Sequence, residues 1–340
     1  RMFHSFSAPN HTIKKQDLQE KENFDILILY IARAGGGKMK LYFKVPPEAD
    51  GALLRSFLRR CSVSADLSRA VKFRGSGFFA DGVPILANRR VEAGQVVSFE
   101  LPPEGEGVAP QSGIPVNVVY EDAFALVLEK PPRLAVHPTL NYPLGTLANG
   151  YAAWAAQRGN SPVFRPVNRI DKDTTGVLVV CKNDAAHNAV AAQLKEHSIT
   201  RKYRAIVHGV IKEDEGTVDA PIGRHPTERK KMASGVKNGK RAVTHYRVLE
   251  RFQGYTYVEC QLETGRTRQI RVHMASIHHP LLGDTVYGPA KDSHHLEGQT
   301  LHAMVLGLIH PVTGEYLEVE APLPEYFENL LKKFRAMSGN

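Results

Sequence analysis

The stretch NRIDKDTTG, Asn168 to Gly176, places two carboxylates, an arginine and two threonines between apolar segments. The flanking segments, SPVFRPV and VLVVCK, are typical of strands, so the polar cluster marks a turn at the rim of a sheet. A carboxylate held there could serve as a nucleophile. Asp171 and Asp173 also have a purely structural interpretation, because an aspartate often caps a turn.

Later segments could supply partners for such a carboxylate. NDAAHNAVAAQLKEHS predicts a helix capped by Asn183 or Asp184. RKYRAIVHG then alternates like a strand and places Tyr203, Ala205 and Val207 on one face. GYTYVECQLETGRTRQIRVHMASIHHPLLGDTVYG predicts a strand, a turn, and a helix that begins near residue 266 and ends before residue 280. Singly, a tyrosine on a strand and an arginine on a helix are weak indications.

Together these segments carry a resemblance. NRIDKDTTG, KYRAIVHG and TGRTRQIRVHMASIHHPLLGDTVYG closely resemble the RluA-type RNA pseudouridine synthase family, in the expected order and spacing. The resemblance continues in VVYEDAFALVLEKPPRLAVHPT and LHAMVLGLIHP, and it spans nearly all of residues 116–320. Several spaced motifs that agree over this length argue against chance similarity. The family detaches uracil from its ribose in RNA and rejoins it through carbon 5.

The resemblance implies a role for each matching residue. Asp171 matches the catalytic aspartate, either as a nucleophile or in a route through a ribose glycal. Tyr203 matches the tyrosine that stacks on the flipped uracil, and Arg271 the basic residue that pairs with the aspartate. The implied substrate-binding residues are Arg169, which fills the space left by the base, Ile270 beneath the base, and Arg266, Arg268 and Thr264. Asn168 and Arg268 stand where the family often has histidine.

Physical chemistry makes this set intelligible. Cleaving a glycosidic bond without a metal calls for an ionised oxygen beside the sugar, and a guanidinium keeps a nearby carboxylate ionised. Aromatic contact restores part of the stacking energy that a flipped base loses. One acid suffices because nothing is hydrolysed, whereas glycosidases use two facing carboxylates. We therefore expect Asp173 to bond the turn backbone together with Thr174 and Thr175.

Two regions carry concentrated positive charge. Residues 53–74 predict two short amphipathic helices around a break at residues 62–64, followed by short strands, an arrangement that resembles the S4 RNA-binding domain. The second region is RHPTERKKMASGVKNGKRAVTHYRV, expected to form a basic hairpin that grips RNA phosphates. In both regions the alternative is a solvated charged surface. The predicted RNA-binding residues are Arg55, Arg59, Arg60, Arg69, Lys72 and Arg74 in the first, and Arg224, Arg229, Lys230, Lys231, Lys237, Lys240 and Arg241 in the second.

Composition sets broader expectations. A net charge of +9 favours polyanionic partners, above all RNA. The three cysteines lie far apart and no apolar run is long enough to span a bilayer, so we expect a soluble, cytoplasmic protein without a secretory signal. The paired histidines at 278–279 and 294–295 lack a third ligand at metal-binding spacing. We expect no metal, no cofactor and a monomer.

The predicted fold class is α+β, with a mixed, mostly antiparallel central sheet and flanking helices. The predicted organisation is a flexible extension (1–37), an S4-like domain (38–103), a linker (104–115) and a catalytic domain (116–340) that ends in a docked helix. The predicted function is uridine isomerisation in structured RNA, foremost large-subunit ribosomal RNA by analogy with S4-bearing relatives. The alternatives are transfer RNA as substrate, a non-catalytic RNA-binding or ribosome assembly factor, and a nucleoside or sugar hydrolase.

Overall fold

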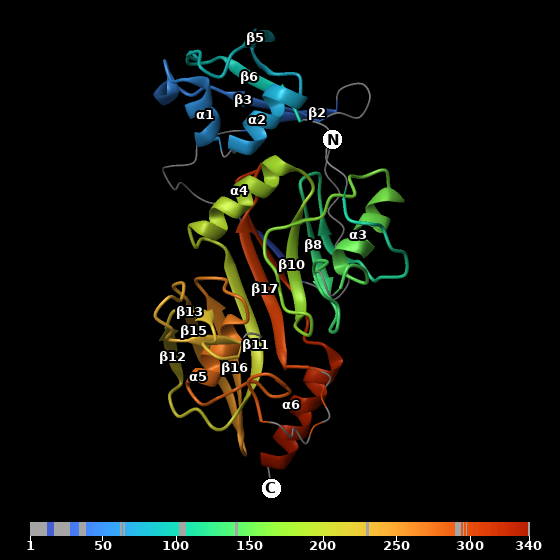
Figure 1. Ribbon diagram of the computed structural model, residues 1–340, viewed down its shortest axis with the longest axis vertical. Helices are drawn as coiled ribbons and strands as arrows, with labels where there is room; N and C mark the ends of the chain where they lie inside the picture. Colours follow the sequence, from blue (N-terminus) through green and yellow to red (C-terminus); the bar gives the residue numbers. More distant parts are fainter. Residues whose placement is uncertain are drawn as a thin grey trace.

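The computed structural model describes residues 12–16, 28–33, 39–61, 63, 65–101, 107–139, 142–228, 231–289, 294, 296 and 298–338. Figure 1 shows a smaller unit that contains α1 and α2 next to a larger one built on long central strands. The elements are β1 (Thr12–Gln16), β2 (Ile28–Arg33), β3 (Met39–Lys44), η1 (Pro47–Ala49), α1 (Leu54–Arg60), α2 (Ala65–Arg74), β4 (Phe78–Ala80), β5 (Val83–Ile85), β6 (Val96–Glu100), β7 (Asn117–Glu121), β8 (Ala125–Lys130), α3 (Leu147–Ala156), β9 (Arg165–Pro166), β10 (Thr175–Cys181), α4 (Asp184–Lys195), β11 (Thr200–His208), β12 (Glu215–Asp219), β13 (Ile222–Arg224), β14 (Met232–Ser234), β15 (Val243–Phe252), β16 (Tyr255–Leu262), α5 (Gln269–Ser276), β17 (Leu301–Ile309), β18 (Tyr316–Glu320) and α6 (Glu325–Ser338).

The larger unit is organised around an 11-stranded sheet. Its strands run in the order β12-β15-β16-β11-β17-β10-β8-β7, while β18 and β1 continue from β17 and β9 pairs with β10. β10 and β17 are parallel through Thr175↔His302 and Gly176↔Ala303, and the other strand pairs of the described residues are antiparallel. The predicted mixed, mostly antiparallel sheet with flanking helices is confirmed.

The central strand β10 is buried on both faces. Leu178 and Val180 belong to one apolar core with residues of α3 and α5, and Val177 and Val179 belong to another with residues of α4. This division follows from the two-residue period of a strand, which sends alternate side chains to opposite faces. The sheet is therefore covered on both sides.

The C-terminal helix α6 docks through an apolar stripe. Phe327, Leu330, Leu331 and Phe334 recur at helical spacing and are buried, and the ring of Phe327 packs against Tyr257 of β16. Helix α4 begins at Asp184 and is capped by Asn183, whose Oδ1 accepts a hydrogen bond from the backbone nitrogen of Ala186. Both predicted helices are confirmed.

The smaller unit has a five-stranded sheet in the order β2-β3-β6-β4-β5, together with the helix pair. Leu54, Phe57 and Leu58 of α1 and Val71 of α2 are buried in its core. The two helices are separated around residues 61–64, as the sequence predicts. Ala185 of α4 belongs to the same buried cluster, so the two units are in contact.

Two boundaries differ from the sequence prediction. β1 pairs with β18 and β2 pairs with β3, so strands occur in the segment predicted as a flexible extension and the smaller sheet begins before residue 38. In the predicted linker, Val108 and Ile114 pack on the core of the larger unit, and the backbone nitrogen of Gln111 donates to the Asn149 carbonyl at 3.0 Å. The polar and glycine-rich composition of these two segments does not reveal contacts with distant parts of the chain.

Other global expectations concern single features. Among the described residues, none of the helices combines the length and apolarity needed to cross a membrane. The three cysteines are buried and unpaired. Within the described part of the chain, no cluster of three or more histidine, cysteine, aspartate or glutamate side chains has an arrangement that could hold a metal ion.

Candidate active site

The polar loop between β9 and β10 is fixed by hydrogen bonds to its backbone and from its side chains. Asn168 Oδ1 accepts from the backbone nitrogen of Val179 at 3.0 Å, and the Asp171 carbonyl accepts from the Thr174 nitrogen at 3.1 Å. Beneath the loop, the fully buried Lys130 donates from Nζ to the Lys172 carbonyl at 2.7 Å. These contacts hold the Asp171 carboxylate in one position at the sheet rim.

Gly176, at the end of this loop, is required by a close approach of strands. Its φ is 106°, and a Cβ there would lie 2.1 Å from the Ala303 carbonyl oxygen of β17. The prediction for Asp173 is wrong, because its carboxylate forms no hydrogen bond with any described residue; the Asp171 carbonyl closes the turn instead. Thr174 and Thr175 bond to side chains, Gln299 and His302 respectively.

Arg271 connects two carboxylates. Its Nη1 donates to Asp171 Oδ2 at 2.9 Å, while Nε and Nη2 donate to Asp284 at 2.7 and 2.9 Å. The Asp284 side chain is 0% exposed and that of Arg271 7%, whereas Asp171 is 28% exposed. The fork of Nε and Nη2 fixes the guanidinium plane on the buried carboxylate. The remaining nitrogen is thereby aimed at Asp171, the partly exposed one.

The pKa values of Arg271 and Asp284 reflect the balance between burial and ion pairing. Burial disfavours the charged form of Arg271, but hydrogen bonds and charge from Asp284 and Asp171 raise its pKa above the ordinary value. Burial likewise opposes ionisation of Asp284, yet bonds from Arg271 and from the backbone nitrogens of Val286 and Tyr287 lower its pKa. Both groups are therefore charged near neutral pH.

The walls beside Asp171 are apolar and aromatic. Tyr203 of β11 and Ile270 of α5 are buried in the same core and line one cavity of about 880 Å³, together with Asp171 and Arg271. Burial raises the pKa of Tyr203, so its phenol stays neutral. The predicted catalytic residues are thus brought together by α5, β11 and the loop before β10.

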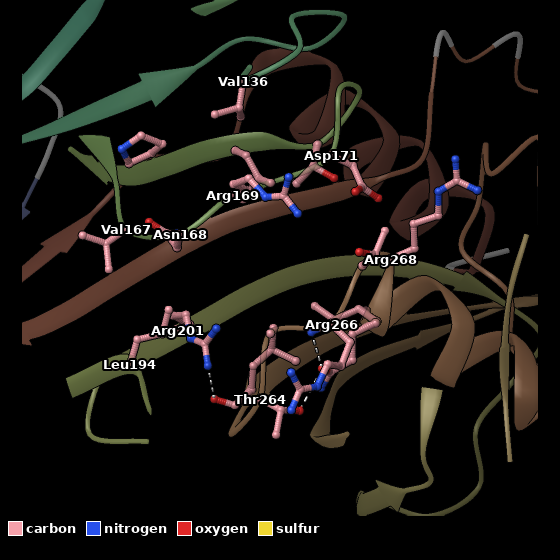
Figure 2. A pocket seen from close by; sticks show the side chains of 18 of the residues that line it. Val136, Val167, Asn168, Arg169, Asp171, Leu194, Arg201, Thr264, Arg266 and Arg268 are labelled. Carbon is pink, nitrogen blue, oxygen red and sulfur yellow. Dashed lines mark hydrogen bonds between the residues drawn. The ribbon is translucent and has the colours of Figure 1, made fainter. Parts of the chain in front are cut away.

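The predicted substrate-binding residues also line this cavity. Figure 2 shows Arg169 and Asp171 on one side and Arg201, Thr264 and Arg266 on the other. Arg169 is exposed, while Arg266 and Arg268 are half-buried. The cavity therefore combines one accessible carboxylate with several cations, which suits a polyanion that carries a polar ring.

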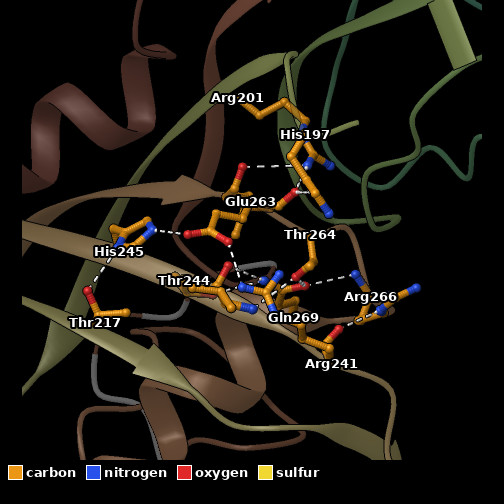
Figure 3. Close-up of polar contacts among 12 residues, drawn as sticks. His197, Arg201, Thr217, Arg241, Thr244, His245, Glu263, Thr264, Arg266 and Gln269 are labelled. Atoms are coloured by element: carbon orange, nitrogen blue, oxygen red, sulfur yellow. Dashed lines mark hydrogen bonds and ion pairs between the residues drawn. The ribbon is translucent and has the colours of Figure 1, made fainter. Parts of the chain in front are cut away.

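The loop before α5 is held by Gln269, which the sequence analysis did not single out. Its Oε1 accepts from the Thr264 hydroxyl and the Arg266 nitrogen, and its Nε2 donates to Val243 and Thr244 (Figure 3). The Thr264 hydroxyl also accepts from the Val243 nitrogen at 2.9 Å. The hydroxyl predicted to bind substrate is engaged within the protein, where it fixes the loop.

Helix α5 begins at Gln269, three residues later than predicted. Arg268 has a φ of 58° and a ψ of 27°, a left-handed conformation that cannot belong to a right-handed helix. Gln269 and Arg266 close the preceding turn, since the Gln269 nitrogen donates to the Arg266 carbonyl at 3.1 Å. The late start leaves Arg266 and Arg268 on a loop facing the cavity.

The predicted RNA-binding residues occupy two separate surfaces. On the smaller unit, the side chains of Arg55, Arg59, Arg60, Arg69 and Lys72 are exposed, and Arg74 lies on α2 with its side chain outside the described part. On the larger unit, Arg224, Lys237, Lys240 and Arg241 are exposed around the β13–β14 hairpin, and Lys231 pairs with Glu228 at 2.8 Å. Arg229 and Lys230 lie outside the described residues. The predicted hairpin is confirmed as an element.

The sequence analysis missed Arg201, which lines the cavity, and Asp284, which lies behind Arg271, although each had a signal. Asp284 interrupts the apolar run of Leu281 and Leu282, and a lone carboxylate in such a run needs a charged partner. Arg201 lies on the face of β11 that carries Tyr203, because strand alternation extends backwards by two residues. Neither sequence signal identifies which residues Asp284 and Arg201 contact or predicts the cavity.

Comparisons with known proteins agree with this geometry. Residues 125–276 match the family model described as RNA pseudouridylate synthase. YlyB of Bacillus subtilis (strain 168), named as an uncharacterized RNA pseudouridine synthase, is 49% identical over 259 residues, 75% of this chain and 84% of the relative. The ribosomal large subunit pseudouridine synthase D of Pseudomonas aeruginosa is 45% identical over 267 residues, 75% of this chain and 83% of that protein.

Solved structures are similar as well. Human RNA pseudouridylate synthase domain containing 4 superposes with a TM-score of 0.54 at 28% identity, over 64% of this chain and 93% of that chain. Human RNA pseudouridylate synthase domain containing 1 has a TM-score of 0.51, also at 28% identity, over 67% of this chain and 97% of that one. With a site of this composition and relatives this similar, the chain belongs to the RluA-type family of RNA pseudouridine synthases, and it is an isomerase.

Proposed function

We propose that the chain converts specific uridines of large-subunit ribosomal RNA to pseudouridine, with Asp171 as the nucleophile and the target base flipped into the cavity. The choice of ribosomal RNA is supported by the Pseudomonas aeruginosa relative, whose name specifies the large ribosomal subunit. The observation that carries the chemistry is the Asp171–Arg271 ion pair on the wall of a cavity that Tyr203 also lines.

Of the two carboxylate oxygens of Asp171, one accepts a hydrogen bond and the other accepts none from the described residues. Oδ2 accepts from Arg271, whereas Oδ1 has no hydrogen-bond partner among the described residues. A carboxylate fixed through one oxygen needs no reorientation before the other attacks the nucleotide, so the loss of rotational freedom precedes the reaction. Asp284, behind Arg271, holds the guanidinium in place without facing the substrate.

The flipped base would lie between apolar and aromatic surfaces. Tyr203 offers a neutral ring for stacking and Ile270 an apolar contact, which together replace part of the stacking that the base loses on leaving the helix. Arg169 is exposed at the cavity mouth, where its planar guanidinium can occupy the vacated gap in the RNA. Flipping costs a few kcal/mol, so both contributions matter.

Two basic surfaces would hold the surrounding RNA. We assign the smaller unit as an S4-like RNA-binding domain, since its helix pair presents exposed arginines on α1 and α2. The β13–β14 hairpin supplies the second surface. Phosphate contacts of this kind position an RNA without reading its sequence. Shape and the flipped base are then left to determine which uridine is modified.

The test combines mapping with a matched pair of variants. Pseudouridines are mapped in total RNA from cells with the gene, without it, and complemented with Asp171→Asn or Asp173→Asn. We expect one or more ribosomal positions to lose the modification without the gene, to regain it with Asp173→Asn and not with Asp171→Asn. Asp173 is the control because it lies two residues away in the same loop and forms no hydrogen bond with any described residue.

The possible results separate the alternatives. Loss confined to transfer RNA would reassign the substrate. Product from the Asp171→Asn protein would contradict the nucleophile. An unchanged map, with RNA binding retained by purified protein, would instead indicate a non-catalytic binding factor.

A further inference from the structure

Arg201 is a second buried arginine on the cavity wall, and it has no carboxylate partner among the described residues. Its side chain is 4% exposed, and no ion pair joins it to an aspartate or glutamate in that part of the chain. The carboxylate of Glu263, the residue whose backbone carbonyl Arg201 contacts, bonds instead to Arg241 and His245, as Figure 3 shows. The charge of Arg201 is therefore not balanced by a carboxylate in the part of the chain that the structure describes.

Among the described residues, one of the three guanidinium nitrogens of Arg201 has hydrogen-bond partners. Nη2 donates to the backbone carbonyl of Glu263 at 3.1 Å and is 3.5 Å from that of Leu262. Nε is buried without an acceptor, and Nη1 forms no hydrogen bond with any described residue. Beside Nη1 stands Gly265, where a Cβ would come within 2.7 Å, so the absence of a side chain leaves the guanidinium its space.

Such a cation is costly for the folded protein. Burial lowers the pKa of Arg201 from its ordinary value, and a buried charge without a counter-charge is unfavourable. The contrast lies on the same strand: Arg204, on the opposite face of β11, is paired with Glu259. Because Arg204 is paired and Arg201, on the cavity wall, has no carboxylate partner among the described residues, the cavity offers a site suited to an external anion.

We propose that Arg201 forms a phosphate subsite for the RNA backbone next to the target uridine. This rests on the proposed function, because the RNA substrate supplies the anion. Nη1 forms no hydrogen bond with any described residue, so its N–H groups are free to donate to a phosphate oxygen, a partner that arginine commonly binds. Arg201 and Tyr203 are two residues apart on β11, about 6.7 Å along a strand, so a nucleotide stacked on the tyrosine brings its own or an adjoining phosphate near the arginine.

The role of Arg201 is binding, not catalysis. Asp171 is already paired with Arg271, and Figure 2 shows Arg201 across the cavity from Asp171. Its loss should therefore raise KM and weaken RNA binding, while kcat at saturating RNA stays close to that of the unaltered chain. A residue that merely supported the fold would change stability and leave the dependence on RNA charge untouched.

The experiment is a double-mutant cycle, in which one change is made in the protein and the other in the RNA. The probe is a short synthetic RNA hairpin that contains a uridine identified by the mapping, in three forms: unmodified, with an uncharged methylphosphonate linkage on the 5′ side of the uridine, and with one on the 3′ side. Affinities are measured for the full chain carrying Asp171→Asn, which prevents turnover, and for the same chain with Arg201→Gln, Arg201→Lys or Arg204→Gln added.

We expect one of the two neutral linkages to weaken binding by about ten- to a hundredfold, the range for a hydrogen bond to a charged group. With Arg201→Gln the same linkage should make little further difference, and the slope of affinity against salt should fall by about 0.7 on single-stranded RNA. Arg201→Lys should retain part of the dependence, and Arg204→Gln all of it.

The outcomes that overturn the proposal are separate from those that overturn the function. Equal binding of all three hairpins by the parent chain would exclude a flanking phosphate contact, even if Arg201→Gln did not fold. An undiminished linkage effect in Arg201→Gln would place the phosphate elsewhere. If the unaltered chain formed no pseudouridine in any RNA, the proposed function itself would fail.

Discussion

Arg271 and Arg201 are both buried at the wall of one cavity, but their surroundings differ. Arg271 bonds to two carboxylates through all three nitrogens, and its pKa is raised. Arg201 reaches only backbone carbonyls through one nitrogen, and burial lowers its pKa. A guanidinium whose three nitrogens all bond to carboxylates is fixed in place and can position a neighbouring group. The other arginine has no carboxylate partner in the described part of the chain and keeps the N–H groups of Nη1 for an anion.

Lys130 extends the comparison to a third buried cation. Its Nζ donates to the carbonyls of Pro131 and Lys172, both at 2.7 Å, and forms no ion pair within the described part of the chain. Burial lowers its pKa to about 7, partly offset by the charges of Asp173 and Asp171. A buried cation bonded only to carbonyls thus has a lowered pKa, whereas carboxylate partners stabilise the charged form and raise the pKa.

The largest effect is expected when the Arg271 pair is broken from one side. Arg271→Gln leaves the fully buried Asp284 without its cation, and breaking a buried pair typically costs about 3–5 kcal/mol. We expect the free energy of unfolding to fall by this order in urea titrations, and pseudouridine formation to be lost. Adding Asp284→Asn should recover part of the stability, because the buried negative charge is removed, but not the activity. Additive losses in the double variant would mean that the two side chains do not act as a pair.

The same measurement on a variant of Arg201 should show little change in the free energy of unfolding. Arg201→Met removes a buried cation that has no counter-charge within the described residues, so the gain from relieving desolvation offsets the lost carbonyl bond. We expect the free energy of unfolding to change by no more than about 1 kcal/mol, while KM for the RNA hairpin rises. A loss of stability as large as that of Arg271→Gln would show that Arg201 is a structural cation and would remove the contrast.

The remaining prediction concerns the pH dependence of stability and Lys130. In the unfolded chain its pKa is near the ordinary 10.5, and in the folded chain it is about 7, so between these values the unfolded chain binds more protons. Stability from this group therefore rises with pH above about 7, by up to about 1.4 kcal/mol per pH unit, and is independent of pH below it. Urea unfolding of the unaltered chain and Lys130→Met at pH 6 to 9 checks this, because only the former should show the rise. Parallel curves would contradict a lowered pKa.

Local pattern predicted much of the fold. The helix pair, the cap of α4, the alternation of β11 and the stripe of α6 all follow from periodicity and capping, which depend on residues close in sequence. The start of α5 was misplaced because the conformation of Arg268 is set by the bonds of Gln269 to Val243 and Thr244, more than twenty residues upstream. Pairing of β1 with β18 was missed for the same reason, since no local signal specifies so distant a partner.

By itself the sequence determined which side chains are available and in what local structures they stand: a carboxylate in a loop between strands, a tyrosine on a strand face and an arginine on a helix. Only the tertiary structure decided which charges meet. Asp171 and Arg271 are 100 residues apart, Arg271 takes Asp284 as its buried partner, and Arg201 is left with none among the described residues. Local patterning depends on side chains a few residues apart, whereas charge pairing depends on the arrangement of β10, β11 and α5 around one cavity.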